Sequence, residues 1–422
     1  MAKVLMKGNE AIGEAAIRAG CLHFFGYPIT PQSEVPEYLA RRLPEVDGQY
    51  VQAESEVAAS NMIYGAAGVG MRVLTTSSSP GISLMAEGIS YIAACELPVV
   101  LVNIMRSGPG LGGILPSQGD YLQATKGMAH GDFKLLTLAP SSVQEAVDLV
   151  ILAFELAERY LNPVMVIGDG MIGQMMEPVA FPDQEIGPPL DPGDWALTGC
   201  GGRERRIVNS LYLDPEACNQ HNIKLHAKWQ RIIEAEQRWE EYNCDEPYDL
   251  LVVAFGMVSR ICKSAIDQLS GQGYRVGLFR PITVNPFPYE ACRRAMDRAA
   301  RVLDVEMSMG QMIQDVQLAA EGSVDIDFFG KAGGVVPSPD QVAEAIKASL
   351  DKAGKARKPS KKARKSAKKP ARKSAEKQAK KSAKKQAKKP AKKQAKKSAK
   401  KQAKKPAKKS PNKSTKPRRT RK

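Results

Sequence analysis

The first 180 residues alternate short apolar runs with longer segments of helical period, and this alternation most constrains the fold. The apolar runs predict strands at Phe24–Tyr27, Arg72–Thr76, Pro98–Ile104, Phe133–Leu138 and Val164–Ile167. The intervening segments predict helices at Glu10–Ala19, Glu56–Ala67, Ile82–Ala94 and Val143–Tyr160. Apolar strands separated by helices are typical of a parallel sheet covered on both faces, so we expect an α/β domain over residues 1–182.

A second, smaller domain is predicted further along the chain. Residues 183–246 begin with a stretch rich in proline, glycine and aspartate and continue with a polar segment that predicts a helix over Pro215–Tyr242. Residues 247–350 resume the alternation, and this pattern indicates a second α/β domain. Its expected strands are Leu250–Phe255, Val276–Phe279, Val302–Val305 and Val324–Phe328, and its expected helices are Ser259–Leu269, Tyr289–Ala300, Met312–Ala320 and Pro339–Leu350.

The composition changes abruptly at Asp351. From Lys352 to Lys422 there are 35 lysines and arginines against a single acid, and residues 382–409 are seven copies of a four-residue unit ending in Ala-Lys-Lys. We expect residues 351–422 to be disordered, because they lack the large apolar residues needed to offset the entropy of an ordered backbone. The formal net charge of +17 therefore divides into +34 on this tail and −17 on residues 1–351.

The cysteine pattern and hydropathy exclude several classes of protein. Seven cysteines are scattered without any Cys-x-x-Cys pair, so neither a zinc ribbon nor a ferredoxin-type cluster is expected, and we predict no metal ligands in the chain. No apolar run approaches the roughly 20 residues that span a bilayer. The N-terminus shows no secretory signal pattern. We expect a soluble, cytoplasmic protein with reduced thiols.

The segment from Gln52 to Gly65 carries the most informative chemistry. It places Glu56 at the start of a helix whose next turns are small and apolar. An acid there is often structural, because a negative charge in the first turn interacts favourably with the helix dipole. The alternative is catalytic: a carboxyl group at a dry helix end can exchange a proton with a nitrogen heterocycle.

Several ordered motifs favour the catalytic alternative. The spacing of Glu56 to Gly65 resembles the cofactor-activating glutamate helix of thiamine diphosphate enzymes. Over about residues 1–350 the chain resembles the α subunit of 2-oxoacid:ferredoxin oxidoreductases, most closely the type that acts on 3-methyl-2-oxobutanoate. The resemblance rests on Gly26–Pro31, Ser79–Met85, Met105–Pro109, Pro116–Asp120, Pro286–Pro288 and Glu306–Gln311. It implies a pyrimidine-binding domain of the thiamine diphosphate type followed by a domain like the C-terminal domain of transketolase.

The resemblance also implies roles for individual residues. Glu56 would hydrogen-bond the N1′ atom of the cofactor's aminopyrimidine, and Glu54 would only flank or cap the helix. Thr30 and Arg106 would bind the 2-oxoacid, with Arg106 on its carboxylate. From the residues alone, Thr30 could equally be a turn residue between prolines, and Arg106 a surface arginine at a strand exit. The remaining cofactor contacts implied are Pro28, Ile29, Ser79 and Gly81.

Two further glycine-containing patterns need interpretation. Gly108–Gly113 matches G-x-G-x-x-G, but Ile114-Leu-Pro116 follows where a dinucleotide fingerprint would open a helix, so we predict a loop beside the site. Gly168-Asp-Gly170 resembles the start of the thiamine diphosphate Mg²⁺ motif, yet the required asparagine does not follow at the usual spacing. This absence predicts that a β subunit carries the diphosphate-binding half, including Mg²⁺. The role of the Glu306–Gln311 loop stays open between cofactor contact and domain packing.

The sequence thus predicts one subunit of a hetero-oligomeric oxidoreductase. Its thiamine diphosphate would be shared with a β subunit, and iron–sulfur clusters would lie on γ and ferredoxin-like subunits. The substrates would be coenzyme A, ferredoxin and a branched-chain 2-oxoacid, with 2-oxoglutarate or pyruvate as alternatives. A function of another class is nucleic-acid binding through the basic tail, because polycations bind polyanions by releasing counterions.

Overall fold

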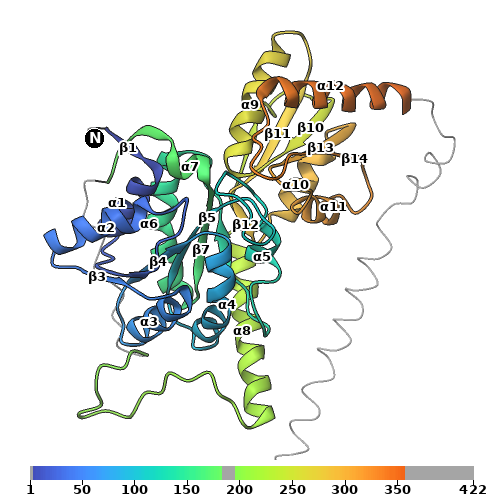
Figure 1. Ribbon diagram of the computed structural model, residues 1–422. Helices are drawn as coiled ribbons and strands as arrows, with labels where there is room; N and C mark the ends of the chain where they lie inside the picture. The colour runs from blue at the N-terminus through green and yellow to red at the C-terminus, as the bar shows by residue number, and fades with distance from the viewer. Residues whose placement is uncertain (1–2, 183–194, 357–422) are drawn as a thin grey trace, which may run out of the picture. The chain divides into compact units, whose positions relative to one another are not determined.

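The computed structural model describes residues 3–182 and 195–356. It contains two main β-sheets, each packed against α-helices (Figure 1). The first sheet has seven strands in the order β12-β6-β7-β5-β4-β2-β3, and all are parallel except β12. These strands are β2 (His23–Gly26), β3 (Gln49–Gln52), β4 (Val73–Ser77), β5 (Val100–Met105), β6 (Leu136–Leu138), β7 (Val164–Asp169) and β12 (Thr283–Asn285). The predicted parallel sheet of the first domain is therefore confirmed.

Helices cover both faces of this sheet (Figure 1). One face packs on α3 and α4 and the other on α1, α2 and α6, because successive strand residues point to opposite sides. The helices are α1 (Gly8–Arg18), α2 (Glu34–Glu45), α3 (Glu56–Gly68), α4 (Pro80–Ala94), α5 (Tyr121–Thr125), α6 (Val143–Tyr160) and α7 (Gly170–Gln174). A separate antiparallel pair joins β1 (Val4–Lys7) to β8 (Met176–Val179).

The second sheet has the strand order β14-β13-β10-β11-β9. Its elements are β9 (Trp239–Tyr242), β10 (Leu250–Val253), β11 (Val276–Pro281), β13 (Arg301–Glu306), β14 (Ile326–Gly330), α9 (Gly256–Ser270), α10 (Tyr289–Met296), α11 (Ile313–Ala320) and α12 (Pro339–Ala356). All its strands are parallel except β9, which lies antiparallel at the edge beside β11. The second predicted α/β domain is likewise present.

The predicted connector helix was wrong at its C-terminal end. Helix α8 (Pro215–Ala235) stops seven residues before Tyr242, and Trp239–Tyr242 forms the edge strand β9. Pairing with β11 and the contacts of Glu240 with Arg280 and Lys263 stabilise this strand. Tertiary pairing at a sheet edge outweighs the local helical pattern, which continued smoothly through this acidic stretch.

The boundary predicted before the basic tail also differs from the structure. Helix α12 continues to Ala356, and the Lys352 amine donates a 2.7 Å hydrogen bond to Asp327. The first residues assigned to the tail therefore complete the last helix, and residues 357–422 lie outside the described part of the chain. Among the described helices, none has the length and apolar character needed to cross a membrane.

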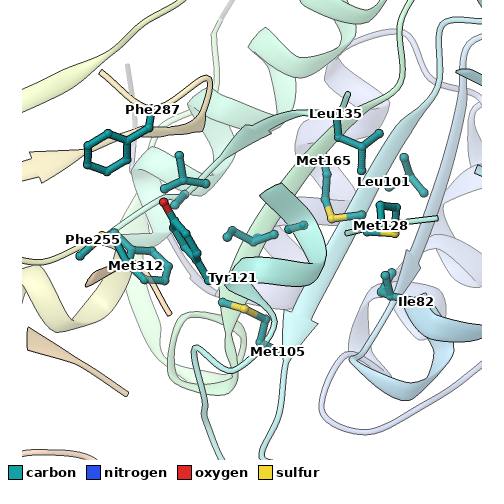
Figure 2. Packing of buried hydrophobic residues seen from close by; sticks show 14 of the residues in the cluster. Ile82, Leu101, Met105, Tyr121, Met128, Leu135, Met165, Phe255, Phe287 and Met312 are labelled. Atoms are coloured by element: carbon teal, nitrogen blue, oxygen red, sulfur yellow. The ribbon is translucent and has the colours of Figure 1, made fainter. Parts of the chain in front are cut away.

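The two sheets share one hydrophobic core. A single cluster of buried residues runs from α3, α4 and the first sheet to β10, α10 and α11 (Figure 2). At its centre the ring of Tyr121 lies 5.4 Å from that of Phe255, and the Tyr121 hydroxyl donates a 2.6 Å hydrogen bond to Asp315. Strand β12 of the later segment also pairs with β6 of the first sheet. These contacts hold the two domains together.

Gln118 makes the most concentrated polar contact of this interface. Its side chain is fully buried, donates to the Phe255 carbonyl and accepts from the Met307 amide, both at 2.9 Å. Gln118→Ala leaves both backbone groups unpaired, and we expect the free energy of unfolding to fall by about 2–4 kcal/mol. Urea denaturation followed by circular dichroism measures this loss. Gln123→Ala, which removes only an exposed hydrogen bond to Ser83, is the control and should change stability by less than about 0.5 kcal/mol.

Candidate active site

The predicted site residues follow the carboxyl ends of three adjacent parallel strands. The Pro28–Pro31 loop comes after β2, the Ser78–Gly81 turn comes after β4, and Arg106 comes directly after β5. In the sheet β4 lies between β2 and β5, so the segments that follow these three strands are neighbours. Ligands of open parallel α/β sheets bind at this edge.

Glu56 begins α3 and is 4% exposed. The neighbouring Ser55 caps the helix by accepting a 3.2 Å hydrogen bond from the Ala58 amide, so Glu56 is not needed as the cap. In the described residues no hydrogen bond or ion pair reaches the Glu56 carboxyl group, whereas Glu54 is exposed. A buried carboxyl group without a partner is costly, which points to a ligand.

Gly81, in the first turn of α4, lies directly against Glu56. A Cβ atom at this position would lie 2.5 Å from the Oε1 atom of Glu56 and 2.0 Å from the Oγ atom of Ser77. No residue larger than glycine fits without displacing the carboxyl group. The absent side chain explains why a glycine follows Pro80 at the start of this helix.

Arg106 is 7% exposed and binds only carbonyl groups among its described neighbours. Its Nη1 atom donates to the Thr30 carbonyl at 2.9 Å and its Nη2 atom to the Leu111 carbonyl at 3.2 Å, while its Nε atom has no partner. No carboxylate of the described residues forms an ion pair with it. A buried guanidinium that keeps its charge and a free N–H is suited to bind a carboxylate ligand.

A buried polar network joins Arg106 to the turn that carries Gly81. The Ser79 hydroxyl donates to Asp120 at 2.6 Å and accepts from the Arg106 amide at 3.0 Å. Asn103 completes the network by donating to Asp120 at 2.9 Å and accepting from the Ser79 amide at 3.1 Å. Burial raises the pKa of Asp120, although these hydrogen bonds and the charge of Arg106 partly oppose the rise.

The structure thus connects Ser79, Arg106 and Thr30 by hydrogen bonds, and Gly81 with Glu56 by direct approach. Thr30 and Pro28 are exposed and Ile29 is half-buried. Sequence reasoning assigned no role to Asn103 or Asp120. Asp120 belongs to the Pro116–Asp120 motif. Asn103 interrupts an otherwise apolar strand, and a polar residue at such a position could have indicated a role in the site.

The Gly108–Gly113 pattern forms a loop, as expected. It opens no helix: Arg106 and Pro116 form an isolated bridge, the Ser107 amide donates to the Leu115 carbonyl, and α5 starts only at Tyr121. Beside this loop lies a cleft of about 280 Å³ between the two domains. The residues that line it are Gly108, Pro109, Ser117, Gly119, Asp120, Ser308, Met309, Gln311, Ala332 and Gly333.

The Glu306–Gln311 loop is organised from within. The fully buried Glu306 carboxylate accepts hydrogen bonds from the Ser308 hydroxyl at 2.8 Å and from the Gln311 and Ile313 amides at 3.0–3.1 Å. The Gln311 side chain accepts from the Leu122 amide across the domain interface. These bonds give Glu306 a packing role, while Ser308 and Gln311 also face the cleft.

Asp169, within the Gly168–Gly170 pattern, caps a helix. It is 1% exposed, and its Oδ1 atom accepts from the Met171 and Ile172 amides at the start of α7. Burial raises its pKa to about 6. Within residues 3–182 and 195–356, no group of three histidine, cysteine, aspartate or glutamate side chains lies close enough together to hold a metal ion.

Comparison with known proteins agrees with this geometry. Residues 14–239 match the family described as pyruvate flavodoxin/ferredoxin oxidoreductase, thiamine diphosphate-binding, and residues 249–342 match core domain II of pyruvate:ferredoxin oxidoreductase. The chain belongs to the 2-oxoacid:ferredoxin oxidoreductase family. It is therefore a subunit of an enzyme of this class, and the fold expected from the resemblance is confirmed.

Relatives of known name extend the comparison. The ketoisovalerate oxidoreductase subunit VorB of Methanothermobacter thermautotrophicus is 47% identical over 349 residues, which cover 82% of this chain and 98% of the relative. The 2-oxoglutarate synthase subunit KorA of the same organism is 35% identical over 366 residues, covering 81% and 97%. Its pyruvate synthase subunit PorA is 27% identical over 375 residues, covering 81% and 94%.

A solved structure resembles the whole described body. The 2-oxoglutarate:ferredoxin oxidoreductase from Magnetococcus marinus, with 2-oxoglutarate, coenzyme A and succinyl-CoA bound, superposes with a TM-score of 0.76 at 25% identity over 82% of this chain. The match spans 65% of that protein's chain. A split-gene transketolase shares the fold, with a TM-score of 0.51 at 12% identity over 82% of this chain and 98% of that one.

The site residues fit the aminopyrimidine of thiamine diphosphate. Glu56 offers a buried carboxyl group without a partner, and the missing side chain of Gly81 leaves that group open. Asp169, where the Mg²⁺ motif would begin, is instead used as a helix cap.

The pKa of Asp169 predicts a pH dependence of stability. Because the folded pKa of about 6 exceeds the ordinary value of 3.8, the folded protein retains a proton that the unfolded chain has already lost. This contribution is complete below about pH 4 and is lost as the pH rises to about 6, by up to ~3 kcal/mol. Asp169→Asn preserves the cap and should remove the decrease, measured by urea unfolding between pH 4 and 7.

A matched control isolates this effect from other titrating groups. Asp214 also caps a helix, α8, but at the protein surface, where it accepts from the Glu216 and Ala217 amides. Asp214→Asn should therefore follow the wild-type pH profile. An Asp169→Asn profile parallel to that of the wild type would show that Asp169 does not titrate in this range.

Proposed function

We propose that this chain supplies the pyrimidine-side half of a thiamine diphosphate site that oxidatively decarboxylates a branched-chain 2-oxoacid, 3-methyl-2-oxobutanoate. The products are acyl-CoA and CO₂, and the electron pair released passes to ferredoxin. The greater identity to the ketoisovalerate oxidoreductase subunit than to the 2-oxoglutarate and pyruvate synthase subunits supports this substrate over 2-oxoglutarate or pyruvate.

The observation that carries the proposal is a pair of buried groups without an ion pair among the described residues: Glu56 after β3 and Arg106 after β5, both beyond the carboxyl ends of strands of one parallel sheet. Glu56 holds and exchanges a proton with the N1′ atom of the aminopyrimidine, and Gly81 keeps the space in front of its carboxyl group open. When bound, the cofactor supplies the electron sink for decarboxylation. Arg106 binds the substrate carboxylate and Thr30 lies beside it, since the two residues are joined through the Thr30 carbonyl. Ser79 fixes the backbone of Arg106.

Partner subunits complete this enzyme. A β subunit provides the diphosphate-binding half with Mg²⁺, and γ and ferredoxin-like subunits carry the iron–sulfur clusters. Two observations support this division: the diphosphate motif is incomplete in the chain, and its seven free cysteines are dispersed, six of them buried or half-buried. We place the complex in the cytoplasm, together with ferredoxin and coenzyme A.

Glu56→Gln tests the proposal in the co-expressed complex. The amide preserves the shape of the side chain but cannot exchange the proton, so coenzyme A-dependent reduction of a viologen dye with 3-methyl-2-oxobutanoate should fall by at least about 100-fold. Glu54→Gln, at an exposed position two residues earlier, is the control and should retain activity. Equal activity of Glu56→Gln and wild type would move the proton transfer to another residue, and a preference for 2-oxoglutarate or pyruvate would correct the substrate.

We propose a second, independent role for the basic tail. Residues 352–422 carry a net charge of +34, whereas the rest of the chain carries −17. This concentration of positive charge favours binding of a polyanion such as nucleic acid. The tail has no aromatic residue on which bases could stack, so this binding should be independent of base sequence.

Removal of the tail separates the two roles. A chain ending at Arg357 keeps the whole of α12, including the Lys352 contact to Asp327, and should retain turnover within about twofold. It should lose retention on a DNA column that the full chain shows at low salt and loses steeply as salt is raised. Unchanged DNA retention of the truncated complex would exclude the tail as the binding segment.

A further inference from the structure

The hydroxyl group of Ser77 is buried and unused at the edge of the cofactor half-site. Ser77 is the last residue of β4 and is fully buried, yet its Oγ atom has no hydrogen-bond partner among the described residues. Buried hydroxyl groups are nearly always paired, because water is lost without compensation otherwise. An unpaired one beside a ligand site points to a partner that arrives with the ligand.

The strand geometry aims Ser77 at the helices that carry the site. Val73, four residues earlier on the same strand, points to the same side as Ser77, because side chains alternate along a strand. Val73 packs in the core cluster of α3 and α4, together with Ala59 and Ile82, whereas Leu74 packs in the cluster on the opposite face. Ser77 therefore faces α3 and α4, and not α1 or α2.

Gly81 shows that Ser77 and Glu56 meet. The position of a Cβ atom on Gly81 lies 2.0 Å from the Ser77 Oγ atom and 2.5 Å from the Glu56 Oε1 atom. Both groups thus border the same small space above the glycine. The Ser77 hydroxyl has no hydrogen-bond partner among the described residues. Because both atoms lie within 2.5 Å of one point, only a small displacement of either side chain separates them from hydrogen-bond geometry.

We propose that Ser77 is a positioning residue for Glu56: it donates a hydrogen bond to the carboxyl oxygen that does not contact the cofactor. This inference rests on the proposed thiamine diphosphate site. A carboxyl group that engages a ring nitrogen through one oxygen keeps its second oxygen as an acceptor, whether the shared proton lies on the oxygen or on the nitrogen. The Ser77 hydroxyl is the described donor placed to use that second oxygen, and it fixes the rotation of the carboxyl plane.

Ser77→Ala in the assembled complex tests this role. Loss of one hydrogen bond to the carboxyl group should weaken thiamine diphosphate binding about tenfold, which corresponds to ~1.4 kcal/mol. Isothermal titration calorimetry of the cofactor-free complex with thiamine diphosphate measures this change directly. Turnover at saturating cofactor should also fall, while the KM for the 2-oxoacid stays unchanged, because Arg106 is not affected.

Two further variants separate positioning from packing. Ser77→Thr retains the hydroxyl and should restore most of the affinity. Thr75→Val removes another buried hydroxyl without a partner, two residues earlier on the same face of β4, and should leave cofactor affinity and turnover as in wild type. Folding of each complex is checked by its melting temperature.

Each outcome decides the inference. The positioning role would be overturned if Ser77→Ala bound the cofactor as tightly as wild type, or if Thr75→Val bound it as weakly as Ser77→Ala. Either result would leave the proposed function intact. Failure of Ser77→Thr to recover affinity while its complex assembles normally would likewise overturn the positioning role alone. If the wild-type complex itself binds no thiamine diphosphate, the proposed function fails, and the inference fails with it.

Discussion

The arrangement of the site depends on the buried Glu306 carboxylate. By accepting two backbone amides and a hydroxyl it fixes the loop that presents Met307 to the first domain. Met307 in turn pairs with Gln118, two residues before Asp120. Asp120 holds Ser79, whose hydroxyl binds the Arg106 amide and whose turn leads into Gly81. A carboxylate of the second domain is thus linked through hydrogen bonds to Ser79 and Arg106 of the first domain.

The three buried arginines of the described residues differ in the partners that they bind. Arg280 is 4% exposed and binds Glu145 through both terminal nitrogens and Glu240 through Nε, and Arg72 is 8% exposed and pairs with Glu158. Their charges are neutralised, and they join elements of the fold. Arg106 is equally buried, but its guanidinium group donates hydrogen bonds only to carbonyl groups and forms no ion pair with a described residue. In the proposed function, the substrate carboxylate supplies the paired negative charge that Arg106 lacks and the other two buried arginines have.

The sequence predicted what local pattern determines and missed what distant contacts determine. The helix Val143–Tyr160 was predicted with its exact limits because Ser142 caps it locally. Strand β9 and strand β12 were missed, because each is short and exists only through pairing with a neighbouring strand that is remote in the sequence. Glu56 could be found from its spacing to a glycine. The role of Asp120 could not, since it depends on Ser79 and Asn103, which only folding brings to its side.

Two buried carboxyl groups of the first domain, those of Asp169 and Glu56, differ in how the fold uses them. Asp169 stands where a metal-binding motif would begin, but both of its hydrogen bonds go to amides of α7, and burial keeps its pKa raised. An aspartate that is 1% exposed and caps a helix is poorly placed to bind Mg²⁺. Glu56 shows the opposite state: it is buried, but no described group occupies its oxygens. This contrast between the two carboxyl groups supports the proposed division of the cofactor site between this chain and a partner subunit.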